Sequence, residues 1–507
     1  MRSNLDNSRW FLRALPFGVL LAIVGLAQAD DWTTIGYDAQ RSGWVRADVK
    51  INTTSVAGPD FELLWKMELG DPGRKMKTLS APMLLDFLIA PKGFRSLGFV
   101  GSRSGSVFVM DTDVARAEWE RHLDFSPRPA ATADCPGGMT SSTSRPTVAA
   151  YPSLGGFVAR GRRSPSKSAV GAPDEGSVIL SQIQPPAPRR PARKADARVR
   201  PPAAGHLRGL NVLSVLTADG MLRTIYVSNG RDHVAPVEFL PSDANARGLI
   251  VVDGVAYVAT ANGCGGAPDG VWALDTASKK VTTWKSTGGS IAGLVGPAIG
   301  SDGVIYAATA DGPLVALEAK MLKQLRASNS AGFRSSPVLF DLNESDHLAV
   351  IAQDGALEIY DAADLSKPVA TSLAGSGESD DVALAVWRDP QGVSWILAPT
   401  GNSISAFRIN EEDGKIASLG RVWRSPKMTS PLPPIVMNGI VFVTAGGNAR
   451  SNAVLHALDG MTGKQLWDSG DSIRSSASGY NLSAGPSHIY VATDDSSLYS
   501  FGIGIEH

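Results

Sequence analysis

Short apolar runs separated by turns dominate the chain. Three clear examples are residues 255–260, 305–309 and 489–493, which are rich in β-branched and aromatic side chains. Each is followed by a polar or glycine-containing turn and a second apolar run, a pattern that predicts β-hairpins. Amphipathic helical periodicity over about 12 residues is hard to find beyond the N-terminal region. The pattern therefore predicts an all-β protein.

The hairpins share a repeated motif. In the clearest copy an apolar strand ends at Asp459, a turn contains Thr462 and Gly463, and the next strand carries Trp467. Two near-copies pair Asp111 with Trp119 and Asp275 with Trp284, and weaker copies begin near residues 316, 359 and 406. The recurrence indicates a repeat protein.

Each residue type in the motif has a structural role. The aspartate can accept hydrogen bonds from the turn backbone, and the glycine can adopt a positive φ. The tryptophan can bury a large area between neighbouring sheets. One such unit cannot bury both of its faces, whereas four-stranded units stacked radially form a β-propeller. We therefore interpret the positions that recur in the motif as parts of the blade structure.

The repeats predict eight blades of roughly 43 residues each, a length typical of four-stranded blades. We place the units at residues 78–124, 208–245, 246–290, 291–330, 331–375, 376–427, 428–473 and 474–503. The units at 208–245 and 376–427 are the least regular, so seven blades remain an alternative.

The two ends of the chain predict how the ring closes. The last unit ends at the apolar strand around Phe501 and lacks a tryptophan strand, whereas residues 63–67 form a strand with Trp65 but no unit before it. One fills the gap left by the other. We therefore expect strand exchange between the termini, which removes exposed sheet edges.

The chain divides into four parts. Residues 1–29 combine three arginines, an uncharged apolar run and Ala27-Gln28-Ala29, which predicts a secretory signal peptide. The alternative, a membrane anchor, requires a longer apolar run of roughly 20 residues. Residues 30–124 hold the N-terminal strand and the first blade, and residues 208–507 hold the remaining blades.

Residues 125–207 form a predicted insert in which the strand pattern fails. Its later part is rich in proline and arginine and contains a single acidic residue between 185 and 204, Asp196. Such a composition cannot bury a core, so we expect partial disorder. A basic run can bind anionic partners, and a solvated loop is the alternative.

Charge and composition narrow the partners. The formal net charge is −1, which provides no global attraction to nucleic acid or acidic lipid. We therefore expect no nucleic-acid partner, no stable membrane insertion after signal cleavage, and a monomer in the periplasm or outside the cell. The protein or small-molecule partner is unknown from the sequence.

Two cysteines and seven histidines leave little redox or metal chemistry. Export permits a disulfide between Cys135 and Cys264, and two unpaired thiols are the alternative. No Cys-x-x-Cys motif is present. The histidines show no zinc-binding spacing, so we predict no metal site.

The motif at residues 457–467, Ala-Leu-Asp-x-x-Thr-Gly-x-x-x-Trp, resembles the repeat of the pyrroloquinoline-quinone (PQQ) propeller superfamily. This superfamily includes quinoprotein alcohol dehydrogenases and the scaffold BamB. The opening, from Asp31-Trp32 through Asp38 to Arg41, resembles it as well. The resemblance spans about residues 61–124 and 208–503.

For a dehydrogenase, the resemblance implies PQQ on the propeller axis, Ca²⁺ held by Glu, Asn and Asp, an aspartate base, and adjacent cysteines in a disulfide. Adjacent cysteines are missing from this chain, and no Glu, Asn and Asp set has a recognisable spacing. The loop from Asn262 to Gly266 is the nearest counterpart of a cofactor-side loop, and a glycine-rich blade turn is its plainer interpretation.

Two functions follow as hypotheses. The first is a non-catalytic propeller that binds a protein or a ligand, which requires no residues beyond the blade frame. The second is a PQQ- and Ca²⁺-dependent oxidoreductase that acts on alcohols or sugars. No catalytic or cofactor-binding residue can be assigned for it, and no cofactor is established. A polymer-cleaving enzyme would need paired carboxylates that the sequence does not identify. Fold alone cannot decide among these functions.

Overall fold

The computed structural model describes residues 31–46, 48, 50–70, 79–90, 93–103, 105–123, 132, 134–135, 143–147, 149, 212–330, 332–375, 382–448 and 450–504. The predicted signal peptide (residues 1–29) and most of the predicted insert lie outside the described residues. Within the described ranges, no helix has the length and apolar character needed to cross a membrane.

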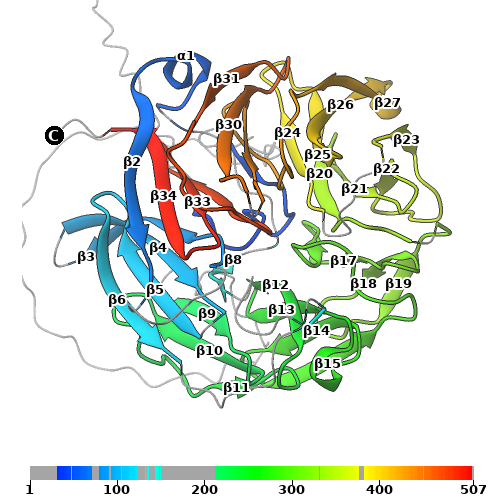
Figure 1. The fold of residues 1–507 in the computed structure, drawn as a ribbon. Helices are drawn as coiled ribbons and strands as arrows, with labels where there is room; N and C mark the ends of the chain where they lie inside the picture. Colours follow the sequence, from blue (N-terminus) through cyan, green and yellow to red (C-terminus); the bar gives the residue numbers. More distant parts are fainter. Residues whose placement is uncertain are drawn as a thin grey trace, which may run out of the picture.

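Eight sheets stand radially around a central axis (Figure 1), and each contains a four-stranded blade, to which a fifth short strand is added in two of them. From inner to outer strand, blade 1 consists of β3 (Met83–Ala90), β4 (Gly93–Gly101), β5 (Ser106–Asp111) and β6 (Arg116–His122). Blade 2 consists, in the same order, of β7 (Thr143–Ser144), β9 (Val212–Leu216), β10 (Met221–Tyr226) and β11 (Val237–Glu238). Blade 3 consists of β12 (Asn245–Val252), β13 (Val255–Ala261), β14 (Gly270–Asp275) and β15 (Lys280–Lys285). Blade 4 consists of β16 (Ala298–Ile299), β17 (Ile305–Ala308), β18 (Leu314–Leu317) and β19 (Gln324–Ala327).

Blade 5 consists of β20 (Val338–Leu342), β21 (Ser345–Ile351), β22 (Ala356–Asp361) and β23 (Ala370–Leu373). Blade 6 consists of β24 (Ala385–Arg388), β25 (Ser394–Thr400), β26 (Ser403–Glu412) and β27 (Lys415–Arg424). Blade 7 consists of β28 (Ile435–Met437), β29 (Ile440–Ala445), β30 (Val454–Asp459) and β31 (Gln465–Asp468). Blade 8 consists of β32 (Leu482–Gly485), β33 (His488–Ala492), β34 (Ser497–Ile503) and β2 (Phe61–Glu68). The predicted eight-bladed propeller is confirmed.

The ring closes by exchange between the two ends of the chain. Strand β2 pairs antiparallel with β34, with Trp65 opposite Ser500, and so completes blade 8. In Figure 1 the blue N-terminal strand lies beside the red C-terminal strand. The predicted strand exchange is therefore confirmed, and it pairs the edges that closure leaves open.

Tryptophans on outer strands dock onto the next blade. Trp119 of blade 1 donates its indole N–H to the carbonyl of Val227 in blade 2 at 2.8 Å. Trp423 of blade 6 donates to the carbonyl of Gly460 in blade 7 at 3.0 Å, and its ring covers Gly463, where φ is +70°. The glycine therefore provides both the turn conformation and the space for the indole of the neighbouring blade.

Other motif residues lie in similar surroundings. Trp65 donates to the carbonyl of Thr112 at 3.2 Å, and Trp467 packs edge-on against Phe61 with ring centroids 4.9 Å apart. Trp284 is partly buried against the cluster that joins blades 3 and 4. The aspartates at the strand ends accept hydrogen bonds from their own turns, at Asp111, Asp275 and Asp459.

Four residues inside the predicted insert form two short strands, although the strand pattern of the sequence fails from 125 to 207. Thr143–Ser144 is the inner strand of blade 2, and β8 (Pro146–Thr147) pairs in parallel with β12 of blade 3. The insert therefore interrupts a blade instead of joining two. Two-residue strands are too short to show an alternating pattern, so the sequence does not reveal them.

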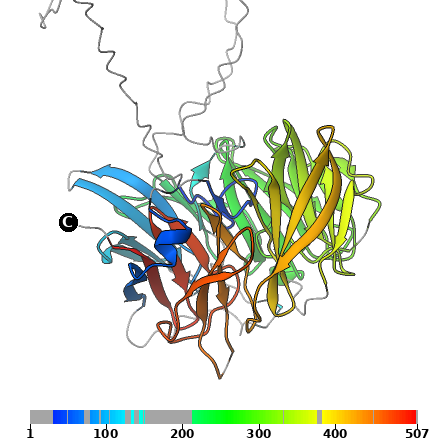
Figure 2. The same ribbon diagram turned by 90° about the horizontal axis from the view of Figure 1, so that it is seen from above.

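Residues 31–46, here called the axial segment, run through the middle of the ring (Figures 1 and 2). Four of their carbonyls each accept a hydrogen bond from the inner strand of a different blade, in order from blade 4 to blade 7. The pairs, carbonyl first, are Ala39–Ile299, Gln40–Leu339, Ser42–Val386 and Gly43–Val436. The segment ends with β1 (Trp44–Val45), which pairs in parallel with β28.

Blades 1 to 3 hold the beginning of the same segment. The carbonyls of Trp32 and Thr33 accept hydrogen bonds from the N–H groups of Leu84 and Arg145, and the Thr34 hydroxyl donates to the carbonyl of Leu249 at 2.8 Å. After the axial segment, the chain forms the short helix α1 (Thr53–Val56), capped by Asn52, and continues into β2. The axial segment therefore contacts seven blades and links their inner strands.

Candidate functional site

A buried arginine anchors the axial segment. Arg41 donates to the carbonyls of Pro297, Ile35 and Gly248 at 2.9, 2.7 and 2.6 Å, and to the hydroxyl of Thr34 at 2.8 Å. Burial lowers the pKa of Arg41 to about 9, against the opposing effect of Asp38. The guanidinium is therefore charged at neutral pH, and its charge strengthens the hydrogen bonds to the carbonyls.

The carboxylate of Asp38 fixes the end of the segment. One oxygen accepts from the Ser42 N–H at 2.9 Å, and the other accepts from the Ser42 hydroxyl at 2.7 Å and from Arg46 Nη1 at 3.2 Å. The guanidinium of Arg46 also lies 4.8 Å from the ring of Trp44. These contacts hold the side chains of Trp44 and Arg46 in place where the segment leaves the axis.

A cleft of about 520 Å³ lies where the axial segment meets blades 6 and 7. Its lining residues come from the end of the axial segment and α1, from the β24–β25 turn, and from the β28–β29 and β30–β31 turns. They are Trp44, Arg46, Thr53, Trp387, Arg388, Asp389, Pro390, Asn438, Gly439, Asp459 and Met461. We call this the Trp–Arg cleft.

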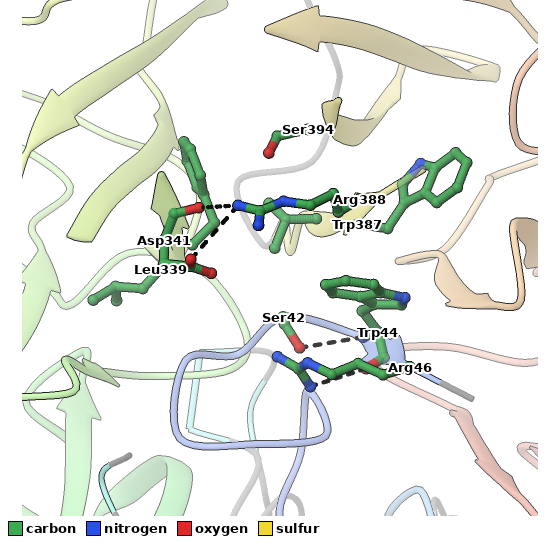
Figure 3. A pocket seen from close by; sticks show the side chains of 10 residues that line it. Ser42, Trp44, Arg46, Leu339, Asp341, Trp387, Arg388 and Ser394 are labelled. Atoms are coloured by element: carbon green, nitrogen blue, oxygen red, sulfur yellow. Dashed lines mark hydrogen bonds and ion pairs between the residues drawn. The ribbon is translucent and has the colours of Figure 1, made fainter. Parts of the chain in front are cut away.

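A smaller cavity of about 20 Å³ adjoins the cleft and extends toward blade 5 (Figure 3). Both are lined by Trp44, Arg46, Trp387 and Arg388. Figure 3 shows Arg388 across this cavity from Trp44, with Arg46 beneath the indole of Trp44.

The two arginines of the cleft differ in how their charge is used. Arg46 is largely buried and paired with Asp38, whose side chain is also buried. Arg388 donates through Nη2 to the main-chain carbonyl of Asp341 at 2.6 Å and lies 3.6 Å from the Asp341 carboxylate. That carboxylate is 48% exposed, so the ion pair is screened by solvent. Nothing in the described part of the chain bonds to Nε or Nη1 of Arg388.

The carboxylate of Asp389 is committed to its own turn. One oxygen accepts from the N–H groups of Gln391 and Val393, and the other accepts from the indole N–H of Trp395 at 2.9 Å. The ring of Trp395 stacks on Trp387, with centroids 6.1 Å apart. A carboxylate held in this way stabilises the cleft wall.

The loop at Asn262 lies apart from the Trp–Arg cleft, and a disulfide between Cys135 and Cys264 ties it down, with Cα atoms 5.6 Å apart. The Asn262 amide donates to the carbonyl of Asp134 at 2.8 Å, and its oxygen lies 3.0 Å from the Ser290 hydroxyl. These contacts hold the loop against residues 134 and 135 of the predicted insert and against Ser290.

The carboxylate oxygens of this loop are engaged in hydrogen bonds. Asp269 accepts from the Gly263 N–H and from the Ser290 hydroxyl, both at 2.8 Å, so both carboxylate oxygens already have partners. No group of three His, Cys, Asp or Glu side chains in the described ranges could hold a metal ion. A His, Cys, Asp or Glu cluster that could hold Ca²⁺ beside PQQ is therefore not seen among the described residues.

Few of the residues that line the Trp–Arg cleft were singled out from the sequence. Of the motif residues predicted from the sequence, Asp459 alone lines the Trp–Arg cleft. Trp44, Arg46, Trp387 and Arg388 were not predicted from the sequence. A possible signal was the position of Trp387, which precedes an Asp-Pro turn on an inner strand and therefore does not fit the outer-strand tryptophan of the repeat.

The fold matches those of several solved structures. A quinohemoprotein alcohol dehydrogenase from Comamonas testosteroni aligns over 94% of this chain and 81% of its own, with 11% identity and a TM-score of 0.54. A europium-containing methanol dehydrogenase aligns over 93% and 98%, with 11% identity and a TM-score of 0.53. BamB from Moraxella catarrhalis aligns over 88% and 99%, with 13% identity and a TM-score of 0.47.

The sequence itself matches no protein-family model and no curated protein. At 11% identity, the likeness to the two dehydrogenases concerns the fold alone. The predicted resemblance to propellers of the PQQ-repeat type is confirmed at that level. Function has to be argued from the site.

Proposed function

We propose that this chain is an exported β-propeller that acts as a non-catalytic binding scaffold, and that its protein or small-molecule ligand binds in the Trp–Arg cleft. The observation that carries the proposal is the cleft itself. Its volume of about 520 Å³ lies within the roughly 300–1,000 Å³ of typical ligand sites, and it combines aromatic walls with a few polar groups.

The cleft is also preformed, which favours binding. Asn438 receives the N–H of Asp48 and donates to the carbonyls of Asp48 and Ile51, so it fixes the chain that follows the axial segment. Arg46 and Asp389 are held by their own partners. Because the walls are already ordered, a ligand would not have to order them on binding.

A thermal-shift screen tests the proposal. The mature protein, residues 30–507, is mixed with a diverse set of small molecules and short peptides, and the melting temperature is recorded. Met461 lines the cleft and is 40% exposed, so Met461→Ser should abolish the shift caused by a true cleft ligand. Met321 lies in the corresponding turn of blade 4 and is 54% exposed. Met321→Ser is therefore the matched control and should keep the shift.

Two results would contradict the proposal. The first is that no compound produces a shift sensitive to Met461→Ser. The second is that the mature protein binds PQQ and Ca²⁺ stoichiometrically and then reduces a dye with alcohols or sugars. Turnover of this kind would make the chain an oxidoreductase and remove the non-catalytic assignment.

Export is tested separately by expressing the full chain in a bacterial host, isolating the periplasmic fraction and sequencing the N-terminus. We expect a mature chain that begins at Asp30. The bond between Cys135 and Cys264 is compatible with this, because disulfides persist in oxidising compartments. An uncleaved chain in the cytoplasm would contradict export without affecting the cleft.

A further inference from the structure

We infer that the Trp–Arg cleft recognises a flat aromatic group that carries a carboxylate. The inference rests on the proposed function and adds the chemical class of the ligand. The charged side chains of the cleft point to this class, because one of them, Arg388, keeps unused hydrogen-bond donors.

Arg388 is the cationic group with donors to spare. Its Nη2 is bonded to the carbonyl of Asp341, and nothing in the described ranges bonds to Nε or Nη1. The side chain is 33% exposed. Arg46, by contrast, is bound to Asp38 and lies against Trp44. A ligand anion would therefore meet Arg388.

The free donors of a guanidinium suit a carboxylate. A planar guanidinium can present two parallel N–H groups to the two oxygens of a carboxylate, and such bidentate pairs are strong and geometrically specific. A phosphate would call for further donors, and no lysine lines the cleft. Asp389 is held by Trp395 and its own turn, and one oxygen of Asp459 accepts three hydrogen bonds within its own turn. The carboxylate that a ligand would have to displace from Arg388 is Asp341, at 3.6 Å, and this pair is weak because the Asp341 side chain is 48% exposed.

The apolar part of the ligand is set by Trp44 and Met461. The Trp44 indole lines both the cleft and the adjoining cavity, and Arg46 lies 4.8 Å from its ring. In Figure 3 the other side of this ring is turned toward the cavity, across from Arg388. The cavity of about 20 Å³ is too small for a ring, so a flat ring would stack, in an offset arrangement, on the part of the indole that lines the cleft of about 520 Å³. The flexible thioether of Met461 can adapt to the edge of that ring.

Calorimetric titration of the mature protein with matched probes tests the inference. The probes are 2-naphthoate, the neutral 2-naphthamide, and the non-planar cyclohexylacetate. We expect 2-naphthoate to bind at least about tenfold more tightly than the other two, as expected for loss of a charged hydrogen-bonded pair or of ring stacking. Arg388→Gln should remove the preference for the acid over the amide, and Arg388→Lys should retain part of it.

Control variants separate binding from folding. Arg421→Gln changes an exposed arginine of the same blade and should leave all affinities unchanged. Trp44→Phe keeps a flat ring and should keep the preference for 2-naphthoate over cyclohexylacetate, whereas Trp44→Leu should lose it. Melting temperatures of all variants verify that each is folded.

A peptide pair distinguishes the two sources of this chemistry. An acetylated tetrapeptide ending in phenylalanine with a free carboxylate is compared with its C-terminal amide. Tighter binding of the free acid than of 2-naphthoate would indicate a chain terminus as the natural ligand, and the reverse order would indicate a small aromatic acid.

Equal affinity for 2-naphthoate and 2-naphthamide, or an unchanged preference in Arg388→Gln, would overturn the inference. So would failure of every acid to bind. In each case the proposed function still stands if the screen finds a ligand that depends on Met461. A screen without any such ligand would overturn both.

Discussion

Replacing Arg41 by methionine tests whether the axial segment holds the propeller together. The side chain is fully buried, and its four hydrogen bonds connect the segment to itself and to blades 3 and 4. Methionine fills a similar length but has no donor. The substitution therefore removes the connection without opening a large cavity.

The structure sets the size of the effect. Three carbonyls lose a charged partner inside the protein, and each buried group left unsatisfied costs about 1–3 kcal/mol. Removing the charge itself offsets part of this cost. Burial disfavours the charged guanidinium, which is why the pKa of Arg41 is lowered to about 9. We expect the free energy of unfolding to fall by about 3–5 kcal/mol, as when one member of a buried charged set is removed.

Urea denaturation, followed by tryptophan fluorescence, measures the overall loss. Hydrogen exchange read by mass spectrometry then locates it. The N–H groups of Leu339, Val386 and Val436 donate to the axial segment, so their protection should fall first. Arg421→Met is the control, because Arg421 is exposed, and surface changes usually stay within about 0.5 kcal/mol. An Arg41→Met protein with the stability and exchange pattern of the control would refute the structural role given to the segment.

Three further predictions concern stability. Burial lowers the pKa of His488 to about 4. The unfolded chain therefore takes up the proton first as pH falls from about 6.5 to 4. The free energy of unfolding should drop by about 3 kcal/mol over this range. His488→Gln should flatten this pH dependence, which is measured as the urea midpoint. Serines at both Cys135 and Cys264 should lower stability by up to about 5 kcal/mol, since the bond spans 129 residues, and reduction of the wild type should give the same midpoint. Gly463→Ala should cost more than Gly303→Ala in the same assay, because both have positive φ but only Gly463 lies under an indole; equal losses would contradict the docking role of that glycine.

The blades could be predicted because their information is local. Within about 11 residues each clear repeat contains a strand end, a turn and a tryptophan, as at Asp459, Gly463 and Trp467. The exchange of strands between the ends followed from the same motif, since Trp65 lacked a unit of its own. Repetition supplied the count, because each irregular unit lies between regular ones.

The axial segment could not be predicted in this way. Its 16 residues have neither strand nor helix periodicity, and they are buried because seven blades surround them. Arg41 reads as a surface residue in the sequence, since arginine is rarely fully buried without partners. Its partners are carbonyls, which every residue has, so no side-chain pattern marks them. The inner strand Thr143–Ser144 escaped for a related reason, as its neighbour in the sheet begins at Val212.

The Trp–Arg cleft depends on the same non-local contacts, and this couples binding to the fold. Trp44 and Arg46 line the cleft only because Asp38 and the inner strands of blades 6 and 7 hold the axial segment in place. A ligand that contacts Trp44 must therefore stabilise the seated segment. At 100 times its Kd this amounts to about 2.7 kcal/mol, close to the loss expected from Arg41→Met. Any ligand that binds only the folded chain raises the free energy of unfolding in this way. A ligand of the whole cleft should also restore the hydrogen-exchange protection of Val386 and Val436 in Arg41→Met, whereas one that contacts only the turns of blades 6 and 7 should not.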